Sequence, residues 1–228
     1  MPITTCVFDA YGTLFDVTAA ARAAAAEPGH GALAAIWPKL AEDWRRKQLE
    51  YSWLRAITGA HTDFRAVTAD GLDWAMAAAG LSDPDLHRRL MALYDRLDAY
   101  PEVPAMLAAL KAAGFATAIL SNGSPAMLDA AVTSAGIGES LDAVLSVESA
   151  GVFKPSPEVY DLVGDRFGCT PAQVLFVSSN GWDAGCATGY GFTTAWVNRA
   201  GAPVDRLPWR PAHTLADLTP IPALARSL

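Results

Sequence analysis

Short apolar runs alternate with longer segments of helical periodicity from Pro101 to about residue 197, and this alternation constrains the fold more than any other feature. Strands that alternate with helices indicate a parallel sheet wound through right-handed crossovers. A further apolar run lies near the amino terminus. The predicted strands are 3–8, 115–120, 143–147, 174–177 and 193–197, and the helices between and before them are 101–113, 125–135, 157–167 and 183–188. This part of the sequence predicts an α/β fold.

The segment between the first strand and Pro101 has a different pattern. Residues 17–97 show apolar positions at spacings of three and four and no convincing strand, so we expect helices there. Pro38 should begin or break one of them, because proline lacks a backbone N–H. Asp83 and Pro84 suit the cap and the first turn of another. The expected helices are 19–26, 32–57, 64–79 and 84–99, with Pro28, Gly29 and Gly31 ending the first.

Length and charge limit the organisation and the class of partner. The 228 residues are 52% hydrophobic and carry a formal charge of -7. This length suits a core with a smaller inserted unit. We therefore predict a Rossmann-like parallel-sheet core, residues 1–15 and 99–228, with a helical cap, residues 16–98. The negative charge argues against nucleic acid and anionic membranes as partners, because both require a basic surface. A small-molecule substrate is the expectation.

Cysteines, histidines and the amino terminus give expectations about location and metals. Cys6, Cys169 and Cys186 are odd in number and lack metal-ligand spacing, which favours reduced thiols in a cytoplasmic protein. The amino terminus lacks a basic start followed by a long apolar segment, and no apolar run approaches the ~20 residues that span a bilayer. The histidines also lack metal-ligand spacing and are assigned to surface or packing: His30, His61, His87 and His213.

Polar residues follow several of the predicted strands. Asp9 comes directly after the first strand, and Gly12 and Thr13 predict a loop behind it. Ligands of open α/β sheets bind outside the carboxyl ends of the strands, so Asp9 is a candidate metal ligand or nucleophile. An Asx-turn or a helix N-cap is the alternative. A lysine near two carboxylates would favour an ionised Asp9. The clusters expected at this edge are Asp9 with Thr13, Ser121 with Asn122, Lys154, and Ser178, Asn180 and Asp183.

Five motifs in order carry a resemblance to a known family. They are FDAYGTLF (8–15), WRRKQLEYSWLR (44–55), ILSNGS (119–124), VFKPSPEVY (152–160) and FVSSNGWDA (176–184). With them the chain resembles, nearly end to end, the L-2-haloacid dehalogenases of the haloacid dehalogenase superfamily. Most members of that superfamily are phosphatases with a second aspartate where this chain has Tyr11, and with acidic metal ligands near Asn180. These departures imply neither magnesium nor phosphate chemistry, and no metal or organic cofactor.

The resemblance implies a reaction in two steps. Asp9 would attack C2 of a short L-2-haloalkanoic acid, expel halide and form an ester, which water would then hydrolyse to a D-2-hydroxy acid. By resemblance Asp183 activates this water. Backbone N–H groups after Asp9 are candidates to stabilise the oxyanion. The resemblance assigns supporting roles to further residues: Lys154, Ser178 and Asn180 orient the reacting groups, Thr13 fixes the nucleophile loop, and Tyr160 hydrogen-bonds within the cluster or serves packing alone.

The resemblance also implies how halide and substrate are bound. Arg45 from the cap would receive the halide, although Trp44-Arg45-Arg46-Lys47 taken by charge alone would indicate a solvated helix face. Arg46 stands where relatives often have an uncharged polar residue, and an extra cation near the pocket would alter which acids are accepted. Leu49 and Phe64 fit helix packing as well as substrate contact. The predicted binding residues are Arg45, Asn122 and Trp182 for halide, Ser121 for the substrate carboxylate, and Tyr11, Leu49, Phe64 and Trp182 for apolar walls.

Two other functions stay open beside the dehalogenase. One is a magnesium-dependent phosphatase of the same superfamily. The other is a catalytically inactive interaction module, which would have no need for Asp9, Arg45, Lys154 and Asp183 together. The resemblance further implies a homodimer, to which the tryptophans of the cap would contribute. The expected partners are a 2-haloacid and halide.

Overall fold

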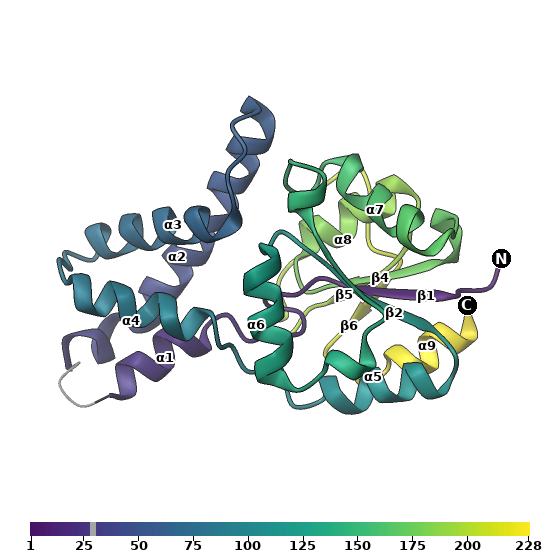
Figure 1. Cartoon of the computed structure of the whole chain (residues 1–228), viewed down its shortest axis with the longest axis horizontal. Coiled ribbons are helices and arrows are strands. Elements are labelled where there is room, and N and C mark those ends of the chain that lie inside the picture. The colour runs from purple at the N-terminus through teal and green to yellow at the C-terminus, as the bar shows by residue number, and fades with distance from the viewer. Residues whose placement is uncertain (28–30) are drawn as a thin grey trace.

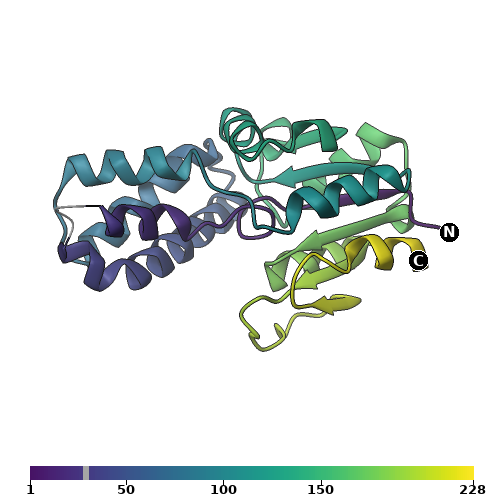
Figure 2. The same cartoon turned by 90° about the horizontal axis from the view of Figure 1, so that it is seen from below.

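The computed structural model of the chain describes residues 1–27 and 31–228. The predicted helix end at Pro28 and Gly29, and His30, lie outside these residues. Figure 1 shows two lobes, one made of the helices α1 to α4 and the other of a sheet with helices on both faces. Both termini lie at the end of the sheet lobe that is remote from the first four helices (Figures 1 and 2).

A six-stranded parallel sheet forms the centre of the core, in the order β3-β2-β1-β4-β5-β6. The fold class predicted from the sequence is confirmed. Helices α5 and α9 cover one face and α7 and α8 the other (Figure 1). The strands are β1 (Thr5–Phe8), β2 (Ala116–Ser121), β3 (Ala143–Ser146), β4 (Val174–Ser178), β5 (Thr193–Val197) and β6 (His213–Leu215). The helices of the core are α5 (Val103–Ala112), α6 (Pro125–Ala135), α7 (Pro157–Phe167), α8 (Gly181–Tyr190) and α9 (Ile221–Ser227), with short 3-10 turns at Gly138–Ser140, Val147–Ser149 and Pro171–Gln173.

The two central strands explain where the polar residues meet. Every residue of β1 and β4 is buried, as expected for strands covered on both faces. Phe8 lies opposite Ile119 of β2 and Val177 of β4. The carboxyl ends of β1, β2 and β4 therefore lie side by side, and the residues that follow them share one edge of the sheet.

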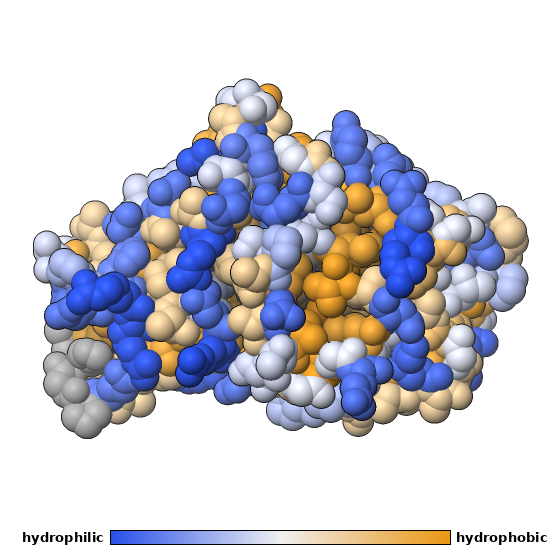
Figure 3. Space-filling view, viewed as in Figure 1, coloured by the Kyte–Doolittle hydropathy of each residue, from blue (hydrophilic) through white to orange (hydrophobic). Residues whose placement is uncertain are grey.

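The cap consists of α1 (Ala19–Ala26), α2 (Gly31–Thr58), α3 (Phe64–Ala78) and α4 (Pro84–Tyr94). The long helix α2 packs against both α1 and α3. The Asp83 carboxylate accepts hydrogen bonds from the backbone N–H groups of Asp85 and Leu86, so the predicted cap of α4 is confirmed. On the face drawn in Figure 3, hydrophilic residues cover much of the cap, whereas hydrophobic residues gather in a hollow of the core.

The prediction that Pro38 begins or breaks a helix is wrong. Helix α2 continues through Pro38, which removes only the hydrogen bond to the carbonyl of Ala34. Ala34 is exposed, so water can solvate that carbonyl. Leu33 and Leu40, on either side of the proline, are buried in the hydrophobic core, and this packing holds the helix together across the interruption.

The predicted end of the fourth helix at residue 99 is also wrong. Helix α4 ends at Tyr94, because the chain turns back to the core. Phe15 and Ala99 form an antiparallel bridge, and the N–H of Tyr100 donates to the carbonyl of Leu14 at 2.9 Å. The two segments that join cap and core are thus paired with each other. The boundaries of core and cap drawn from the sequence stay a prediction.

Other element predictions have mixed outcomes. The helices 19–26, 125–135 and 157–167 and the strand 193–197 have the predicted bounds. Strand β6 and helix α9 were not predicted, and they are only three and seven residues long. Across the described parts of the chain, none of the helices combines the length and the apolar character that a membrane crossing needs.

The predictions for cysteines and histidines can be compared with their surroundings. Cys6, Cys169 and Cys186 are free, and burial raises the pKa of the Cys6 thiol to about 12. His61 packs against the ring of Phe153, with 4.7 Å between ring centroids. The other described histidines lie outside the cluster around Asp9: His87 is 3.3 Å from a carboxylate oxygen of Asp73, and His213 begins β6.

Candidate active site

The Asp9 carboxylate lies at the carboxyl end of β1 and is held by three side chains. Its Oδ2 accepts hydrogen bonds from Thr13 Oγ1 at 3.0 Å and Asn180 Nδ2 at 2.9 Å. Its Oδ1 is 3.2 Å from Lys154 Nζ. Asp9 is buried, and its backbone N–H donates to the carbonyl of Val177. A carboxylate fixed by side chains from three segments is not what an Asx-turn or a helix cap predicts.

The loop after Asp9 is shaped by Gly12 and Thr13. Gly12 has a φ of +89°, and a Cβ atom there would come within 3.1 Å of Ser179 Oγ. Glycine is therefore required both for the backbone conformation and for the close approach. Besides its bond to Asp9, Thr13 Oγ1 accepts from the backbone N–H of Ser179 at 2.8 Å. The loop after Asp9 is in this way bonded to the end of β4.

Lys154 is the only fully buried cation described in the site, and it bridges two carboxylates. Its Nζ is 3.2 Å from Asp9 Oδ1 and 2.9 Å from Asp183 Oδ2, and only 1% of its side chain is exposed. Burial by itself would lower the pKa of Lys154, but the charges of Asp183 and Asp9 outweigh it and raise that pKa. Lys154 is therefore a permanent cation that partly offsets both aspartates.

For Asp183, in contrast, the effect of burial on the pKa outweighs the effect of the neighbouring charge. Asp183 is fully buried in the first turn of α8, and its Oδ1 accepts a hydrogen bond from the Tyr160 hydroxyl at 2.8 Å. Burial raises the pKa of Asp183, and the attraction of Lys154 reduces this effect without cancelling it. The expectation from the sequence, that Lys154 favours ionised carboxylates, left out this burial of Asp183. Burial and the charge of Asp183 raise the pKa of Tyr160 well above its usual value, so Tyr160 stays a hydrogen-bond donor.

Arg45 brings a cation from the cap to this edge of the sheet. One guanidinium nitrogen, Nη2, donates to the carbonyl of Tyr11 at 3.1 Å and to Asn180 Oδ1 at 3.3 Å. Its neighbour Arg46 is exposed, forms ion pairs with Asp43 and Glu50, and therefore does not place an extra cation near the pocket. The two arginines point in different directions because consecutive residues of a helix face away from each other.

Aromatic rings line the boundary between cap and core. Tyr11 is buried, with its ring centroid 5.9 Å from that of Phe64 and 5.4 Å from that of Tyr94. Trp182 of the core meets Trp53 of the cap edge to face at 5.3 Å. Phe64 thus packs against the ring of Tyr11, and its contact with substrate stays a prediction. Leu49 is half-buried one helical turn beyond Arg45, on the same face of α2.

Ser121, Asn122 and Ser178 occupy the ends of β2 and β4 and are engaged with nearby backbone. The hydroxyl of Ser121 accepts from the N–H of Gly123, Asn122 Oδ1 accepts from the N–H of Lys154, and the hydroxyl of Ser178 accepts from the N–H of Asn180. A hydroxyl that accepts in this way can still donate its hydrogen. Their proposed contacts with substrate and halide stay predictions.

Two residues that the sequence analysis missed support the site. Gln48 is buried, and its Nε2 donates to Thr68 Oγ1 at 2.7 Å and to the Tyr94 hydroxyl at 3.1 Å. This arrangement turns Oε1 of Gln48 toward Arg45 Nη1, at 2.7 Å. The only sequence signal was the spacing of three residues from Arg45.

Arg199 is the second missed residue. Its Nη2 donates to the carbonyl of Thr13 at 3.3 Å and lies 2.7 Å from Glu102 Oε1. Its guanidinium lies 3.8 Å from the ring centroid of Tyr100. Arg199 therefore ties the nucleophile loop to the segment that returns from the cap. Nothing in the sequence around Arg199 indicated these contacts, because they link residues far apart in the chain.

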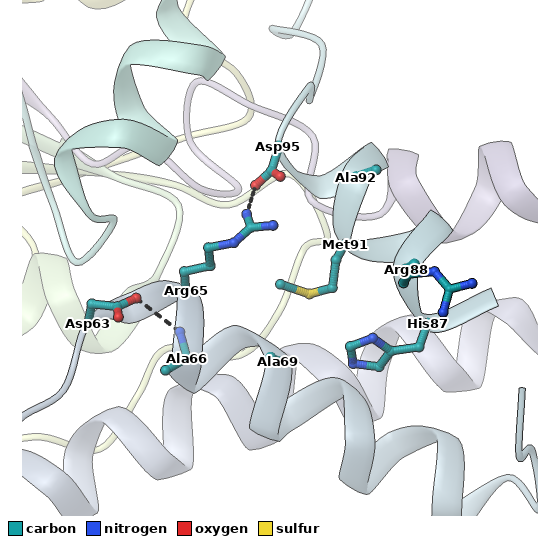
Figure 4. Close-up of a pocket in the computed structure, with 9 residues that line it drawn as sticks. All are labelled: Asp63, Arg65, Ala66, Ala69, His87, Arg88, Met91, Ala92 and Asp95. Carbon is teal, nitrogen blue, oxygen red and sulfur yellow. Dashed lines mark hydrogen bonds and ion pairs between the residues drawn. The ribbon is translucent and has the colours of Figure 1, made fainter. Parts of the chain in front are cut away.

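A separate cavity of about 510 Å³ lies within the cap between α3 and α4 (Figure 4). Arg65 and Asp95 form an ion pair at one side of it, and Met91 lies between them and His87. None of the residues that bond to Asp9 lines this cavity. This cavity is therefore separate from the cluster of polar residues around Asp9. Within residues 1–27 and 31–228, no group of three or more His, Cys, Asp or Glu side chains is placed to hold a metal ion.

Comparison with known proteins decides the family. The model of the haloacid dehalogenase-like hydrolases matches residues 3–189. The (S)-2-haloacid dehalogenase 1 of Pseudomonas sp. strain CBS-3 is 43% identical over 224 residues, which cover 98% of this chain and 96% of the relative. The chain belongs to the (S)-2-haloacid dehalogenase family. Another member, from Xanthobacter autotrophicus, is 49% identical over 85% of this chain and 74% of the relative.

A solved structure of this family has the same overall fold. It is the L-2-haloacid dehalogenase from Xanthobacter autotrophicus with chloropropionic acid covalently bound, with a TM-score of 0.88 and 39% identity, covering 99% of both chains. The resemblance inferred from the five motifs is thus confirmed, and so is membership of an enzyme family that hydrolyses carbon-halide bonds.

Proposed function

We propose that the chain hydrolyses short L-2-haloalkanoic acids to D-2-hydroxy acids and halide, through an ester on Asp9 and without a metal. The observation that carries this proposal is the bridge that Lys154 makes between Asp9 and Asp183 at the sheet edge, opposite Arg45 of the cap. One carboxylate is thereby oriented as a nucleophile and a second one lies beside it. The membership in the (S)-2-haloacid dehalogenase family supports the same reaction.

The first step is displacement at carbon. An oxygen of the Asp9 carboxylate attacks C2 of the substrate, the carbon-halogen bond breaks, and halide leaves with the electron pair. Attack from the side opposite the halogen inverts the configuration at C2. The bonds from Thr13, Asn180 and Lys154 restrict the carboxylate to one orientation, which reduces the entropy lost on reaching the transition state.

The second step hydrolyses the ester. Water attacks the carbonyl carbon of the Asp9 ester and passes a proton to Asp183. The bond between this carbon and the substrate oxygen then breaks with its electron pair on oxygen, and the resulting alkoxide takes the proton from Asp183, which releases the hydroxy acid and restores both carboxylates. The raised pKa of Asp183 suits a proton acceptor, because a more basic carboxylate takes the proton more readily. Tyr160 and Lys154 each bind one oxygen of Asp183 and so keep it in place.

Arg45 is proposed to receive the halide. Negative charge accumulates on the halogen during displacement, and a fixed guanidinium in a buried setting stabilises it more than water does. Asn122 and Trp182 would complete the halide site. Ser121 and backbone N–H groups near Tyr11 would hold the substrate carboxylate, and Tyr11, Leu49, Phe64 and Trp182 would line the alkyl group.

The rival functions lack comparable support. A phosphatase would bind its magnesium through acidic residues where this chain has Tyr11 and Asn180. An inactive module would leave the cost of burying Lys154 with two aspartates unexplained, since burying charges is unfavourable even when they are paired.

Halide release in the presence of a chelator tests the proposal. We expect chloride from L-2-chloropropionate with EDTA present, measured by ion chromatography. Asp9→Asn should lower turnover by on the order of 10⁴-fold or more, as expected for loss of a nucleophile. Asp129→Asn, at an exposed aspartate of α6, is the matched control and should keep full activity. Release of halide by Asp9→Asn at the wild-type rate would exclude Asp9 as nucleophile.

An isotope experiment tests the ester directly. In water enriched in ¹⁸O, a single turnover should place the label on the enzyme, in the Asp9 carboxyl group, rather than in the product. Mass spectrometry of the hydroxy acid and of the peptide that contains Asp9 distinguishes the two. Label found directly in the hydroxy acid would contradict the ester.

We also propose a cytoplasmic homodimer. Three free cysteines fit a reducing compartment. Leu54 of α2 is 51% exposed and Trp74 of α3 is 36% exposed, which leaves apolar surface on the cap for a second copy. Trp44 is buried inside the cap, so it would not take part. Sedimentation equilibrium should give twice the mass of the chain, and Leu54→Glu should shift it toward the monomer.

A further inference from the structure

An apolar cavity of about 440 Å³ lies between the carboxyl end of α2 and the core. The carboxyl end of α2 projects beyond the other cap helices (Figure 1). The cavity volume falls in the range of small-molecule sites. None of the residues that line it carries a charge. They include Trp53 and Ile57 of α2, Val152 and Pro155 of the loop before α7, Trp182 of α8, and Leu207.

Residues of α2 that line the cavity follow residues of the candidate active site along the same helix. Arg45, Leu49, Trp53 and Ile57 follow one another at intervals of four residues, so each lies beside the next in a row that is inclined to the axis of α2. With a rise of about 1.5 Å per residue, Trp53 lies roughly 12 Å along the helix axis from Arg45. The row of side chains that begins at the proposed halide-binding arginine therefore ends at residues that line the cavity.

On the core side, two residues that line the cavity are direct sequence neighbours of active-site residues. Pro155 directly follows Lys154, whose ammonium group contacts Asp9, and Trp182 directly precedes Asp183. Trp53 and Trp182 contact each other edge to face, with ring centroids 5.3 Å apart. Both rings line the cavity. This tryptophan pair forms one wall of the cavity, and Trp182 is at the same time one of the proposed walls of the substrate site.

We infer that this cavity is a subsite for the alkyl tail of 2-haloacids longer than the short acids of the proposed function. The inference rests on that function, because the carboxylate, the halogen and C2 of the substrate are then fixed near Asp9 and only the tail can extend toward the tryptophan pair. Ile57 is 81% exposed and Leu207 is 36% exposed at this cavity. A tail bound there removes their apolar surface from water.

Binding of straight-chain carboxylates without a halogen tests the subsite independently of turnover. Octanoate and propanoate are titrated into the wild-type protein, and tryptophan fluorescence is recorded. Each buried methylene is worth roughly a fourfold gain in affinity, so three or four of them give on the order of 10²-fold tighter binding of octanoate. Equal dissociation constants for the two acids would overturn the inference.

Variants that fill or charge the cavity provide the second test. Ala56→Phe adds a ring at a half-buried position that lines it, and Ile57→Asp adds a charge at an exposed one. Both should lower kcat/KM for 2-bromooctanoate at least tenfold and leave 2-bromopropanoate within about twofold. Ala35→Phe, at an exposed alanine of the same helix, should change neither value. Equal effects of Ile57→Asp on the two substrates would contradict the subsite even if Ala56→Phe did not fold.

The outcomes separate this inference from the proposed function. Absence of halide release from every acid, together with tight octanoate binding that Ile57→Asp weakens, would refute the function and retain an alkyl-binding cavity. Release from 2-bromopropionate without any preference for octanoate would retain the function and refute the subsite. A changed sedimentation coefficient of Ile57→Asp with an unchanged chain-length profile would assign the cavity to a contact between copies, which also overturns the inference.

Discussion

The core side and the cap side of the candidate active site are built in different ways. On the core side, Asp9, Lys154 and Asp183 are buried and bonded to one another. On the cap side, α2 has ion pairs on its outer face, such as Lys47 with Glu50, and sends one guanidinium inward. Groups that must act on each other are thus fixed within one lobe, whereas the lobe that covers them contributes a single charge.

The two sides also differ in how strongly they are attached. Asp9 is held by bonds that come from within the core, and these exist whether or not the cap is in contact. Arg45 reaches the core only through the carbonyl of Tyr11 and the amide of Asn180, at 3.1 and 3.3 Å. Movement of the cap would break these two hydrogen bonds and the contact of His61 Nε2 with Glu148 Oε2 at 3.1 Å, and it would leave the bonds to Asp9 in place.

Removal of the bridging lysine should have the largest effect, because it breaks the core side. Lys154→Met leaves two buried carboxylates facing each other, and we expect a loss of roughly 3–5 kcal/mol in the free energy of unfolding together with loss of turnover. Urea unfolding and halide assays measure both. Lys111→Met is the control, since its ion pair with Asp142 is about one-third exposed. Equal stability losses in the two variants would show that burial of Lys154 is unimportant.

The raised pKa of Lys154 leads us to expect a loss of stability at alkaline pH. Nearby carboxylates raise the pKa of Lys154 above its ordinary value of 10.5, despite burial, which acts in the opposite direction. Between pH 10.5 and that higher pKa, the folded chain holds more protons than the unfolded chain, so the free energy of unfolding falls as the pH rises. Buried tyrosines with raised pKa values act in the same direction. The fall above pH 10.5 should therefore be steeper for the wild type than for Lys154→Met.

The adjacent residues Arg45 and Arg46 should differ strongly in their effect on the rate of halide release. Arg45→Ala should slow halide release in a single turnover by about 10²–10³-fold, as for loss of one donor to a developing charge. Hydrolysis of the ester should be slowed less. Arg46→Ala should stay within about twofold, because Arg46 faces solvent and pairs with Asp43 and Glu50. Equal slowing of both steps by Arg45→Ala would contradict the assignment of Arg45 to the halide site.

Gln48 should have a smaller effect, since it acts through Arg45. Gln48→Leu removes the acceptor for Arg45 Nη1, and we expect about a tenfold loss in kcat with little change in KM. Gln48→Glu keeps an acceptor at this position and should recover most of the rate. Chloride inhibition, which reports on the proposed halide site, should weaken in the leucine variant and recover in the glutamate variant. Equal impairment of both variants would mean that Gln48 serves packing alone.

The smallest effect on activity is expected at Pro38. Pro38→Ala restores a backbone hydrogen bond inside α2 and should raise the free energy of unfolding by about 1–3 kcal/mol, with kcat unchanged. Pro157→Ala is the control, because Pro157 occupies the first turn of α7, where its missing N–H has no helical partner. A change in kcat for Pro38→Ala would show that the helix transmits its distortion to Arg45.

The difference between the core side and the cap side also explains which parts of the site could be predicted from the sequence. The strands β1, β2 and β4 are apolar runs that end in polar residues, so their shared edge and the grouping of Asp9 with Asn180 followed from local pattern and sheet topology. The orientation of Arg45 did not, because charge pattern treats Arg45 and Arg46 alike and only the packing of α2 separates them. Gln48 and Arg199 were missed for a related reason, since their partners are distant in sequence.

The burial of Cys6 has a consequence for an enzyme of this kind. Short 2-haloacids alkylate thiolates, so a protein that handles them is exposed to damage by its own substrates. Cys6 is fully buried in β1, and burial raises the pKa of its thiol to about 12, which disfavours the reactive thiolate near neutral pH. The sheet that carries Asp9 to its edge thereby protects the sulfur atom of Cys6 from the electrophile.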